Sequence, residues 1–317
     1  MIIIVTQKKR SLRCERTAIV ILWMLSLFVL FYFLRSPSTA KNAVKSALDV
    51  CAVGLIPSLF PFVVLVSIIN SSGLSQRISK IVGVPLGVIF GISESASSAI
   101  ILGALGGFPI GAVCTRELYT SAEITKSDAE RLITFTNNAS PAFCIGVVGA
   151  SFFGDTAFGV RLYLCQMISG VTVGILQRKK VCAQSVSKNG TEHIDLARTV
   201  TAAISNGALT MLTICAFAVF FAVVGDALCT TVRHYFGDMF ATLVGATCEI
   251  TLGARTSVTL GGNISRILCA FAVGWSGISV HMQVSSILAD TKISMRRYYL
   301  CKLMQGILTA SLICLFI

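Results

Sequence analysis

Charged side chains are scarce in this sequence. Only 13% of its 317 residues are charged, 55% are hydrophobic, and the mean hydropathy is +0.82. A typical soluble domain carries about 25% charged residues. The apolar residues form long blocks rather than amphipathic stripes. The composition therefore predicts an all-α polytopic membrane protein whose main partner is the lipid bilayer.

Several kinds of chemistry lack the residues that they need. The three histidines are far apart and have no ligand-spaced partners, so we expect no metal site. Twelve cysteines occur without a CxxC pair, which predicts packing residues rather than disulfides. No GxxxxGK[ST] loop is present, so this chain is not expected to use ATP. No nucleophile with an adjacent base is visible, so neither an enzyme nor a cofactor is predicted.

The basic residues fall in short segments between the apolar blocks. This distribution is typical of topology signals and does not indicate binding of nucleic acid, despite a net charge of +12. The first block, residues 18–34, follows five basic residues, and we expect a retained anchor with a cytoplasmic N-terminus rather than a cleaved signal peptide. Further spans are predicted at residues 46–70, 132–153, 162–176, 199–225, 267–288 and 298–317.

Two more apolar blocks, residues 81–111 and 239–263, are each interrupted by glycines and a glutamate. Basic residues flank both ends of the first block, so both ends are expected on the cytoplasmic side. Two complete spans need about 40 residues, whereas the block has 31. We therefore predict a re-entrant helical hairpin in each block. Broken backbone at membrane depth is tolerated only inside protein or beside a watery cavity, so the hairpins are expected to line a site.

The two hairpins occupy similar places in two halves of the chain. Residues 107–127 match residues 274–294 at a constant offset of 167, although residues 161–170 also resemble residues 297–306. Because an extra span separates the halves, we predict two inverted repeats, as in secondary transporters. The expected organisation is a basic N-terminus with an anchor helix (1–45), a first repeat with a linking span (46–177), a cytoplasmic loop (178–198) and a second repeat (199–317).

Two glutamates are the strongest candidates for function. Glu94 and Glu249 lie deep within apolar blocks, where a carboxylate costs several kcal/mol unless it is paired, protonated or solvated. The alternative is that they cap half-helices, as Ser93 and Ser95 could also do. Arg255, six residues after Glu249, is either its ion-pair partner or a clamp for a substrate carboxylate.

Two motifs contribute further candidates for substrate binding. FTNNASP contains Asn137 and Asn138 before a proline, and a kink there would make both amides candidate ligands. Hydrogen bonding between helices is the alternative for both. GGFPIGA contains Gly107 and Pro109, so a helix can end and begin again there with N–H groups that favour an anion. Close packing of helices is the alternative for this motif.

These motifs together resemble a known family. GGFPIGA, LYTSAEITKSDAERLITFTNNASP and GWSGISVHMQVSSILADTKIS are similar to sporulation integral membrane proteins of the YlbJ type, within the wider group that carries nucleoside-recognition (Gate) domains. The likeness covers about residues 45–317, and AERL-x-x-FTN-x-x-SP is its most specific part. The family usually has GYPIGA and TNTSSP, so Asn138 is a less secure ligand than Asn137.

The resemblance implies a multi-pass protein of endospore-forming bacteria, in the outer forespore membrane, linked to movement of dipicolinate from the mother cell. The wider group looks like concentrative nucleoside transporters, whose hairpin glutamates contact the base. We therefore expect a transporter of a small anionic aromatic acid that works by alternating access. The alternatives are a nucleoside transporter and a non-transporting scaffold of spore-envelope assembly. The substrate, direction, coupling ion and oligomeric state, a homo-oligomer included, are left open.

In the leading scheme each candidate residue has a role. Arg255 and the half-helix N-termini would meet the substrate carboxylates, while Asn137 and Asn138 would offer hydrogen bonds. Ionised carboxylates would repel an anion, so Glu94 and Glu249 are expected to be protonated, paired or bound to a coupling cation.

Overall fold

The computed structural model describes residues 2–179 and 195–317, and all regular structure in these ranges is helical. Four of the helices are long and apolar enough to cross a membrane, or up to six spans if each of two bent helix pairs counts as one. The all-α polytopic class is thus confirmed. Most of the predicted cytoplasmic loop, residues 178–198, lies outside the described residues.

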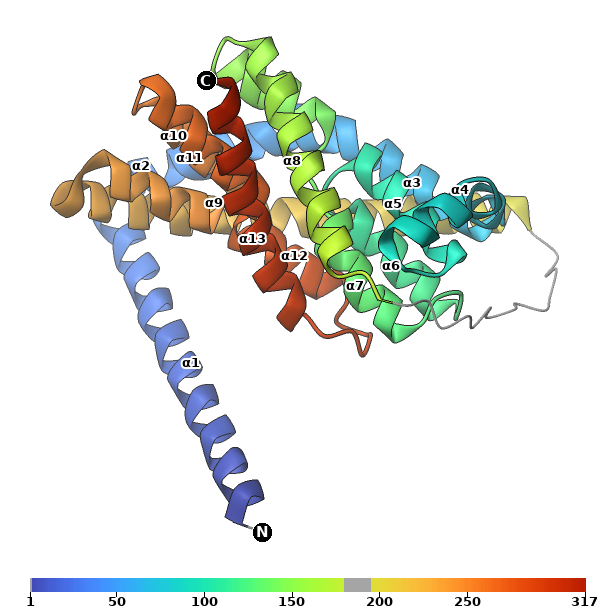
Figure 1. Ribbon diagram of the computed structural model, residues 1–317. Coiled ribbons are helices and arrows are strands. Elements are labelled where there is room, and N and C mark those ends of the chain that lie inside the picture. The colour runs from blue at the N-terminus through green and yellow to red at the C-terminus, as the bar shows by residue number, and fades with distance from the viewer. Residues whose placement is uncertain (1, 180–194) are drawn as a thin grey trace.

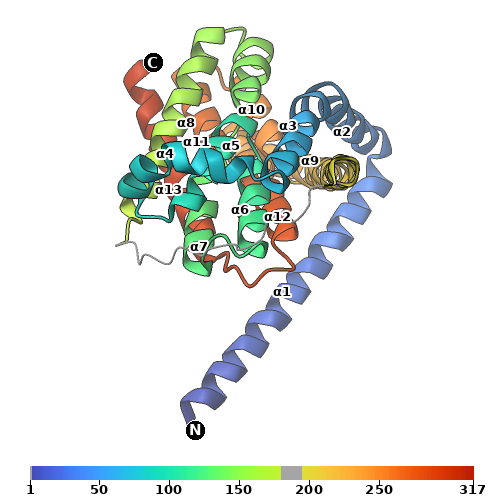
Figure 2. The ribbon, with the colours of Figure 1, turned by 90° about the vertical axis from the view of Figure 1, so that its right-hand side faces the viewer.

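The N-terminal anchor is helical and extends away from the rest of the molecule (Figure 1). Helix α1 (Ile2–Arg35) turns by 108° into the segment that contains α2 (Pro37–Asp49). The hydroxyl of Tyr32 donates to Asp226 Oδ2 at 2.9 Å, which ties the end of α1 to helix α9 (Leu196–Cys248). Figure 2 looks nearly along α9 and shows α2 beside it, in agreement with their contacts.

The first half of the chain consists of short helices separated by breaks. In order these are η1 (Val50–Leu55), α3 (Ile56–Ser71), α4 (Leu74–Phe90), η2 (Glu94–Ala96), α5 (Ser97–Gly106), α6 (Ile110–Thr120), α7 (Lys126–Thr136), η3 (Ala142–Phe152) and α8 (Thr156–Leu176). Of these, η1 and η3 are π-helical and η2 is a 3₁₀ turn. The chain bends by 87° between α3 and α4, at Gly73, whose φ of 77° suits glycine.

The second half begins with the long helix α9, which is kinked at Gly237. It continues with α10 (Ile250–Val258), α11 (Gly262–Trp275), α12 (Gly277–Ile287), α13 (Arg296–Ile313) and η4 (Cys314–Phe316). Helix α13 packs against α7, α8 and α11, and this contact joins the two halves (Figure 1). The ten cysteines whose side chains are described are free, and most are buried.

Both blocks that the sequence predicts as hairpins are broken helices. The first is interrupted after Phe90 and again after Gly106, and the second at Glu249 and after Val258. Gly107 has a φ of 79°, and a Cβ atom there would lie 2.6 Å from the Cβ of Ser140. The break in GGFPIGA therefore packs against the break in FTNNASP.

The internal repeat is visible in the helix boundaries. Helices α6 and α12 both have 11 residues. Their first residues, Ile110 and Gly277, are 167 positions apart, and so are their last residues, Thr120 and Ile287. Each helix follows a break, leads into a loop, and is followed by α7 or α13 respectively. The members of each pair, α6 with α12 and α7 with α13, are in contact.

Helix α7 with η3 and helix α13 contain the predicted spans 132–153 and 298–317, and they run in the same direction, as the count of spans predicts for these two spans. Before α13, the Ser294 amide donates to Glu130 Oε1 of α7 at 3.1 Å. At the far end of α13, the Phe316 carbonyl accepts from Arg161 of α8, just after η3. Thus α7 with η3, and α13, run from one end of the molecule to the other in the same direction (Figure 1). The predicted inversion of the two halves as wholes stays a prediction.

Candidate functional site

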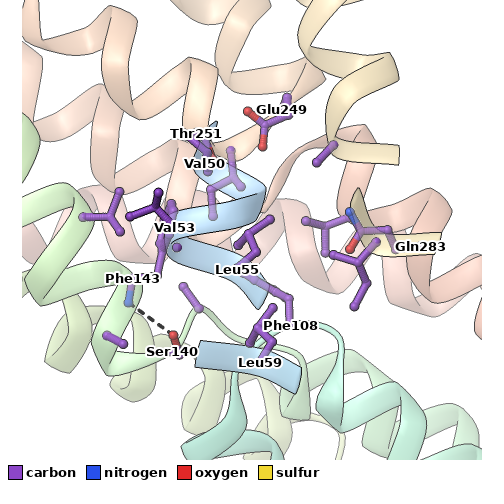
Figure 3. A pocket seen from close by; sticks show the side chains of 18 of the residues that line it. Val50, Val53, Leu55, Leu59, Phe108, Ser140, Phe143, Glu249, Thr251 and Gln283 are labelled. Carbon is purple, nitrogen blue, oxygen red and sulfur yellow. Dashed lines mark hydrogen bonds between the residues drawn. The ribbon is translucent and has the colours of Figure 1, made fainter. Parts of the chain in front are cut away.

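A cavity of about 400 Å³ lies between the helix breaks of the two halves (Figure 3). Its polar lining groups are Ser140, Glu249, Thr251 and Gln283, and its other walls are almost entirely apolar. The apolar lining residues are Val50, Val53, Gly54, Leu55, Pro57, Leu59, Phe108, Ala139, Ala142, Phe143, Val147, Ile214, Ala218, Ile250 and Val280. A cavity of this size, with apolar walls and a few placed polar groups, is typical of a small-molecule site.

Irregular helices form two walls of this cavity. Val50 to Leu55 belong to the π-helix η1, and Ala142, Phe143 and Val147 belong to the π-helix η3. Pro141 immediately precedes η3, and a proline suits this position because the N–H of the first helical residue has no acceptor within the helix. The π-helix is rare, and the single-turn π-bulges in which it mostly appears are frequent at functional sites.

Glu249 both caps a helix and faces the cavity. Its Oε2 accepts a hydrogen bond from the Leu252 amide at 2.7 Å, so its carboxylate occupies the N-terminus of α10. The side chain is only 6% exposed and forms no ion pair within the described ranges. The free N–H groups and the dipole of α10 stabilise its negative charge. Capping and function are thus compatible, and a role for Glu249 in binding stays a prediction.

Arg255 forms no ion pair with Glu249 in the described ranges, although both residues line one small cavity. Its Nη1 donates to Ser46 Oγ at 2.9 Å, and its side chain is exposed. Residues six apart on a helix lie on different faces, whereas residues three or four apart are neighbours. Arg255 instead lines a second cavity of about 110 Å³, which shares wall residues with the first: Val50, Leu55, Ala218, Glu249 and Thr251. Glu249 therefore stands between two adjoining cavities.

Glu94 lies elsewhere. It is exposed in a separate depression of about 760 Å³, whose lining includes Arg178 and Lys179. A Cβ atom on Gly83 of α4 would lie 2.8 Å from the Cβ of Glu94, so α4 holds the Glu94 turn close to itself. The structure therefore does not bring the two glutamates into one pocket. The glycine-rich breaks in the sequence predicted a turn at each glutamate. The packing of α4 against the turn at Glu94 places this side chain outside the central cavity.

The two serines beside Glu94 share its surroundings. The Ser93 hydroxyl is buried and has no hydrogen-bond partner among the described residues. The Ser95 carbonyl accepts from the hydroxyls of Ser79 and Ser98, both at 3.3 Å. Neither Ser93 nor Ser95 is among the residues that line the cavity beside Glu249.

Asn137 occupies the helix start at which an anion was expected. Its Oδ1 accepts from the Ala112 amide in the first turn of α6 at 2.9 Å, and its Nδ2 donates to the Ile133 carbonyl at 3.1 Å. The helix begins after Pro109, as predicted, and the peptide bond between Phe108 and Pro109 is cis. In this conformation Asn137 links the two motifs to each other, so its role as a substrate ligand stays a prediction.

A buried polar cluster, which sequence reasoning missed, lies behind the two motifs. Lys302 Nζ donates to the Asn137 carbonyl at 2.9 Å and to Gln305 Oε1 at 2.7 Å. Gln305 Nε2 donates to Asn138 Oδ1 at 2.6 Å and to the Gln166 carbonyl at 3.2 Å. Asn138 and Gln305 are 167 residues apart, so this bond joins equivalent positions of the repeat. Extending the offset past residue 294 would have aligned these two positions, but only the structure shows that they are in contact.

A third cavity, of about 460 Å³, follows the first along the same helices. It is lined by Val63 and Ser67 of α3, by Asn206, Gly207, Leu209, Thr210 and Thr213 of α9, by Ser286 and Ile287 of α12, and by Val113, Arg116, Glu117, Ala289 and Asp290. Arg116 Nε donates to Asp290 Oδ1 at 2.9 Å, and a second bond makes the pair bidentate. This hydrogen bonding lowers the pKa of the Asp290 carboxyl.

The chain is similar to a known integral membrane protein. It is 26% identical to the sporulation integral membrane protein YlbJ of Bacillus subtilis strain 168, in an alignment of 324 residues that covers 90% of this chain and 79% of that protein. The resemblance to the YlbJ-like family is confirmed. No protein-family profile matches the chain, and no solved structure is similar to it. The relative is an integral membrane protein. The long apolar helices of this chain likewise indicate a multi-pass membrane protein.

Proposed function

We propose that this chain is a sporulation-associated transporter that moves a small anionic aromatic acid, of the dipicolinate kind, by alternating access. The observation that carries the proposal is the cavity beside Glu249, which is enclosed by the helix breaks of both halves. The relative YlbJ is a sporulation integral membrane protein, which supports a role of this chain in sporulation. Its proposed location is the outer forespore membrane, with a homo-oligomer as an open alternative to a monomer.

The series of cavities supports a path through the molecule. The small cavity at Arg255 adjoins the central one, and the cavity at Arg116 follows it along α3, α9 and α12. The buried side chains of Leu59, Val63 and Ile214 lie between the central cavity and the cavity at Arg116: Leu59 and Ile214 line the first, and Val63 lines the second. An apolar barrier between two cavities is what alternating access requires in one of its closed states.

The chemistry of the path suits an aromatic carboxylate. Phe108 and Phe143 can pack against a planar ring in the central cavity. Arg255, in the smaller outer cavity, offers a guanidinium group that matches carboxylate geometry, whereas Arg116 in the other outer cavity is paired with Asp290. Glu249, at the capped start of α10, would bind a proton or a coupling cation rather than the anion itself.

One observation favours a second candidate, a nucleoside transporter. Glu249 forms no ion pair within the described part of the chain and shares the cavity with Gln283 and Ser140. A carboxylate with neighbouring amide and hydroxyl groups can accept and donate hydrogen bonds to a nucleobase. In this alternative Glu249 would contact the substrate directly. No enzymatic activity is proposed for either case.

Uptake by purified protein in liposomes tests the proposal. Labelled dipicolinate, uridine and adenosine would be compared side by side, with empty liposomes as the control. Saturable uptake of dipicolinate that is not inhibited by nucleosides supports the proposal. Uptake of nucleosides alone supports the second candidate. If no labelled compound enters saturably, transport is refuted and the scaffold interpretation is favoured.

A further inference from the structure

We propose that Lys302 is the binding residue for a carboxylate of the substrate, and that Phe108 separates it from the central cavity until the substrate arrives. This inference rests on the proposed transport of an anionic aromatic acid. It concerns a residue that no motif of the sequence singled out.

The first observation is a buried cation without an acidic partner. Lys302 is 0% exposed, and no carboxylate lies within ion-pair distance of its Nζ in the described ranges. Its two hydrogen-bond acceptors, the Asn137 carbonyl and Gln305 Oε1, are both uncharged. Burying an ammonium group without a counter-charge is costly, and such residues in membrane segments usually have a functional role. An anion would provide the missing charge.

The second observation is the position of Phe108. The Lys302 Nζ lies 5.4 Å from the centroid of the Phe108 ring. Phe108 also lines the central cavity (Figure 3). The aromatic ring therefore stands between the ammonium group and the cavity, where it offers Nζ a weak cation–π contact. Phe108 belongs to the broken stretch between α5 and α6, so its backbone is not held by helical hydrogen bonds.

The third observation is the supply of unused donors in the same cluster. An ammonium group has three N–H donors, and Lys302 has two hydrogen-bond acceptors among the residues that the structure describes. Gln166 is 0% exposed, and its Nε2 has no hydrogen-bond partner among the described residues. Its backbone carbonyl accepts from Gln305, so Gln166 borders the same polar cluster, while its side-chain Oε1 accepts from Cys144 Sγ at 3.5 Å. A carboxylate is acceptor-only and would match such donors.

These observations together define a binding step. When the Phe108 ring turns aside, a carboxylate in the central cavity can replace it next to Lys302 Nζ. A charged hydrogen bond then replaces the weaker cation–π contact, and the buried charge is neutralised. A neutral molecule of the same shape gains neither effect. Lys302 would therefore set the preference for charge, while the apolar walls set the preference for shape.

The test measures charge selectivity in proteoliposomes. Dipicolinate would be compared with pyridine-2,6-dicarboxamide, a neutral molecule of similar shape, for the wild type, Lys302→Gln and Lys302→Arg. Lys302→Gln is expected to reduce kcat/KM for dipicolinate roughly 10- to 100-fold, as for loss of one charged hydrogen bond. It should leave the amide unaffected, and Lys302→Arg should retain most selectivity. Lys292→Gln, which removes an exposed lysine from the loop before α13, is the matched control.

A second measurement does not depend on the folding of a variant. Lys302 in the wild type would be labelled with an amine-reactive reagent and quantified by mass spectrometry. Dipicolinate is expected to protect it, and Phe108→Ala is expected to increase its labelling. Unchanged charge selectivity in Lys302→Gln, or labelling that dipicolinate does not reduce, would overturn the inference alone. Absence of dipicolinate uptake by the wild type would instead refute the proposed function on which it rests.

Discussion

Replacement of Glu249 by glutamine separates the two roles that its position combines. Glutamine has nearly the same size and keeps an oxygen that can accept from the Leu252 amide, now 2.7 Å from the carboxylate. The variant loses only the charge, and with it the favourable interaction with the N-terminus of α10. That interaction contributes about 0.3–1 kcal/mol at most helix ends. The free energy of unfolding should therefore fall by no more than about 1 kcal/mol.

Transport should respond far more strongly than stability. Glu249 is 6% exposed and lies where the central cavity meets the smaller one beside Arg255. If its carboxylate carries a proton or a cation through each cycle, glutamine cannot replace it. The initial rate of dipicolinate uptake in proteoliposomes should fall at least roughly ten-fold, as for loss of one charged interaction. Thermal unfolding in detergent, measured on the same preparation, reports the small change in stability.

Glu94→Gln is the informative comparison, because Glu94 lies in a separate depression beside Arg178. A shared pocket would make both variants equally defective, whereas the observed separation predicts a larger loss in Glu249→Gln. Full transport activity in Glu249→Gln would refute the assignment of a functional charge to this cavity. Its carboxylate would then be only a helix cap.

Three further predictions follow from packing and charge. Ala218 lines both adjoining cavities, so Ala218→Trp should block uptake without unfolding the protein. A Cβ atom on Gly253 would lie 2.4 Å from the Ala246 Cα, so Gly253→Ala should lower the free energy of unfolding by about 1–3 kcal/mol. Arg116 lowers the pKa of Asp290, so the ion pair stabilises the fold at neutral pH. Its contribution, below about 1 kcal/mol because both groups are partly exposed, should be lost as the pH falls below about 4.

Each of these predictions has a control on the same chain. Ala216→Trp adds the same bulk at an exposed position of α9 that lines neither cavity, and should be active. Gly146→Ala adds a methyl group with no atom within 4 Å, and should not lower the melting temperature. Asp290→Asn lacks the ion pair with Arg116 at every pH, so the part of the stability loss at acidic pH that comes from protonation of Asp290 should be absent in this variant. Equal effects in a variant and its control would contradict the corresponding explanation.

The sequence alone determined the helices, the positions of the breaks and the register of the repeat. Gly107, which has a positive φ, and Pro109 break the helix between α5 and α6, because glycine can adopt a positive φ and proline supplies no N–H. The offset of 167 likewise predicted the match between α6 and α12. These features depend on residues that are neighbours along the chain.

Only the tertiary structure decided which residues meet. Glu249 reaches the central cavity and Glu94 does not, although both were predicted from similar broken blocks. Lys302 was overlooked because its acceptor at Asn137 is 165 residues away, beyond any local pattern. The packing of α13 against α7 and α8 also depends on residues that are distant in the sequence. Helix breaks arise from local backbone preferences, whereas the side chains that surround a cavity are selected by packing between helices far apart in the sequence.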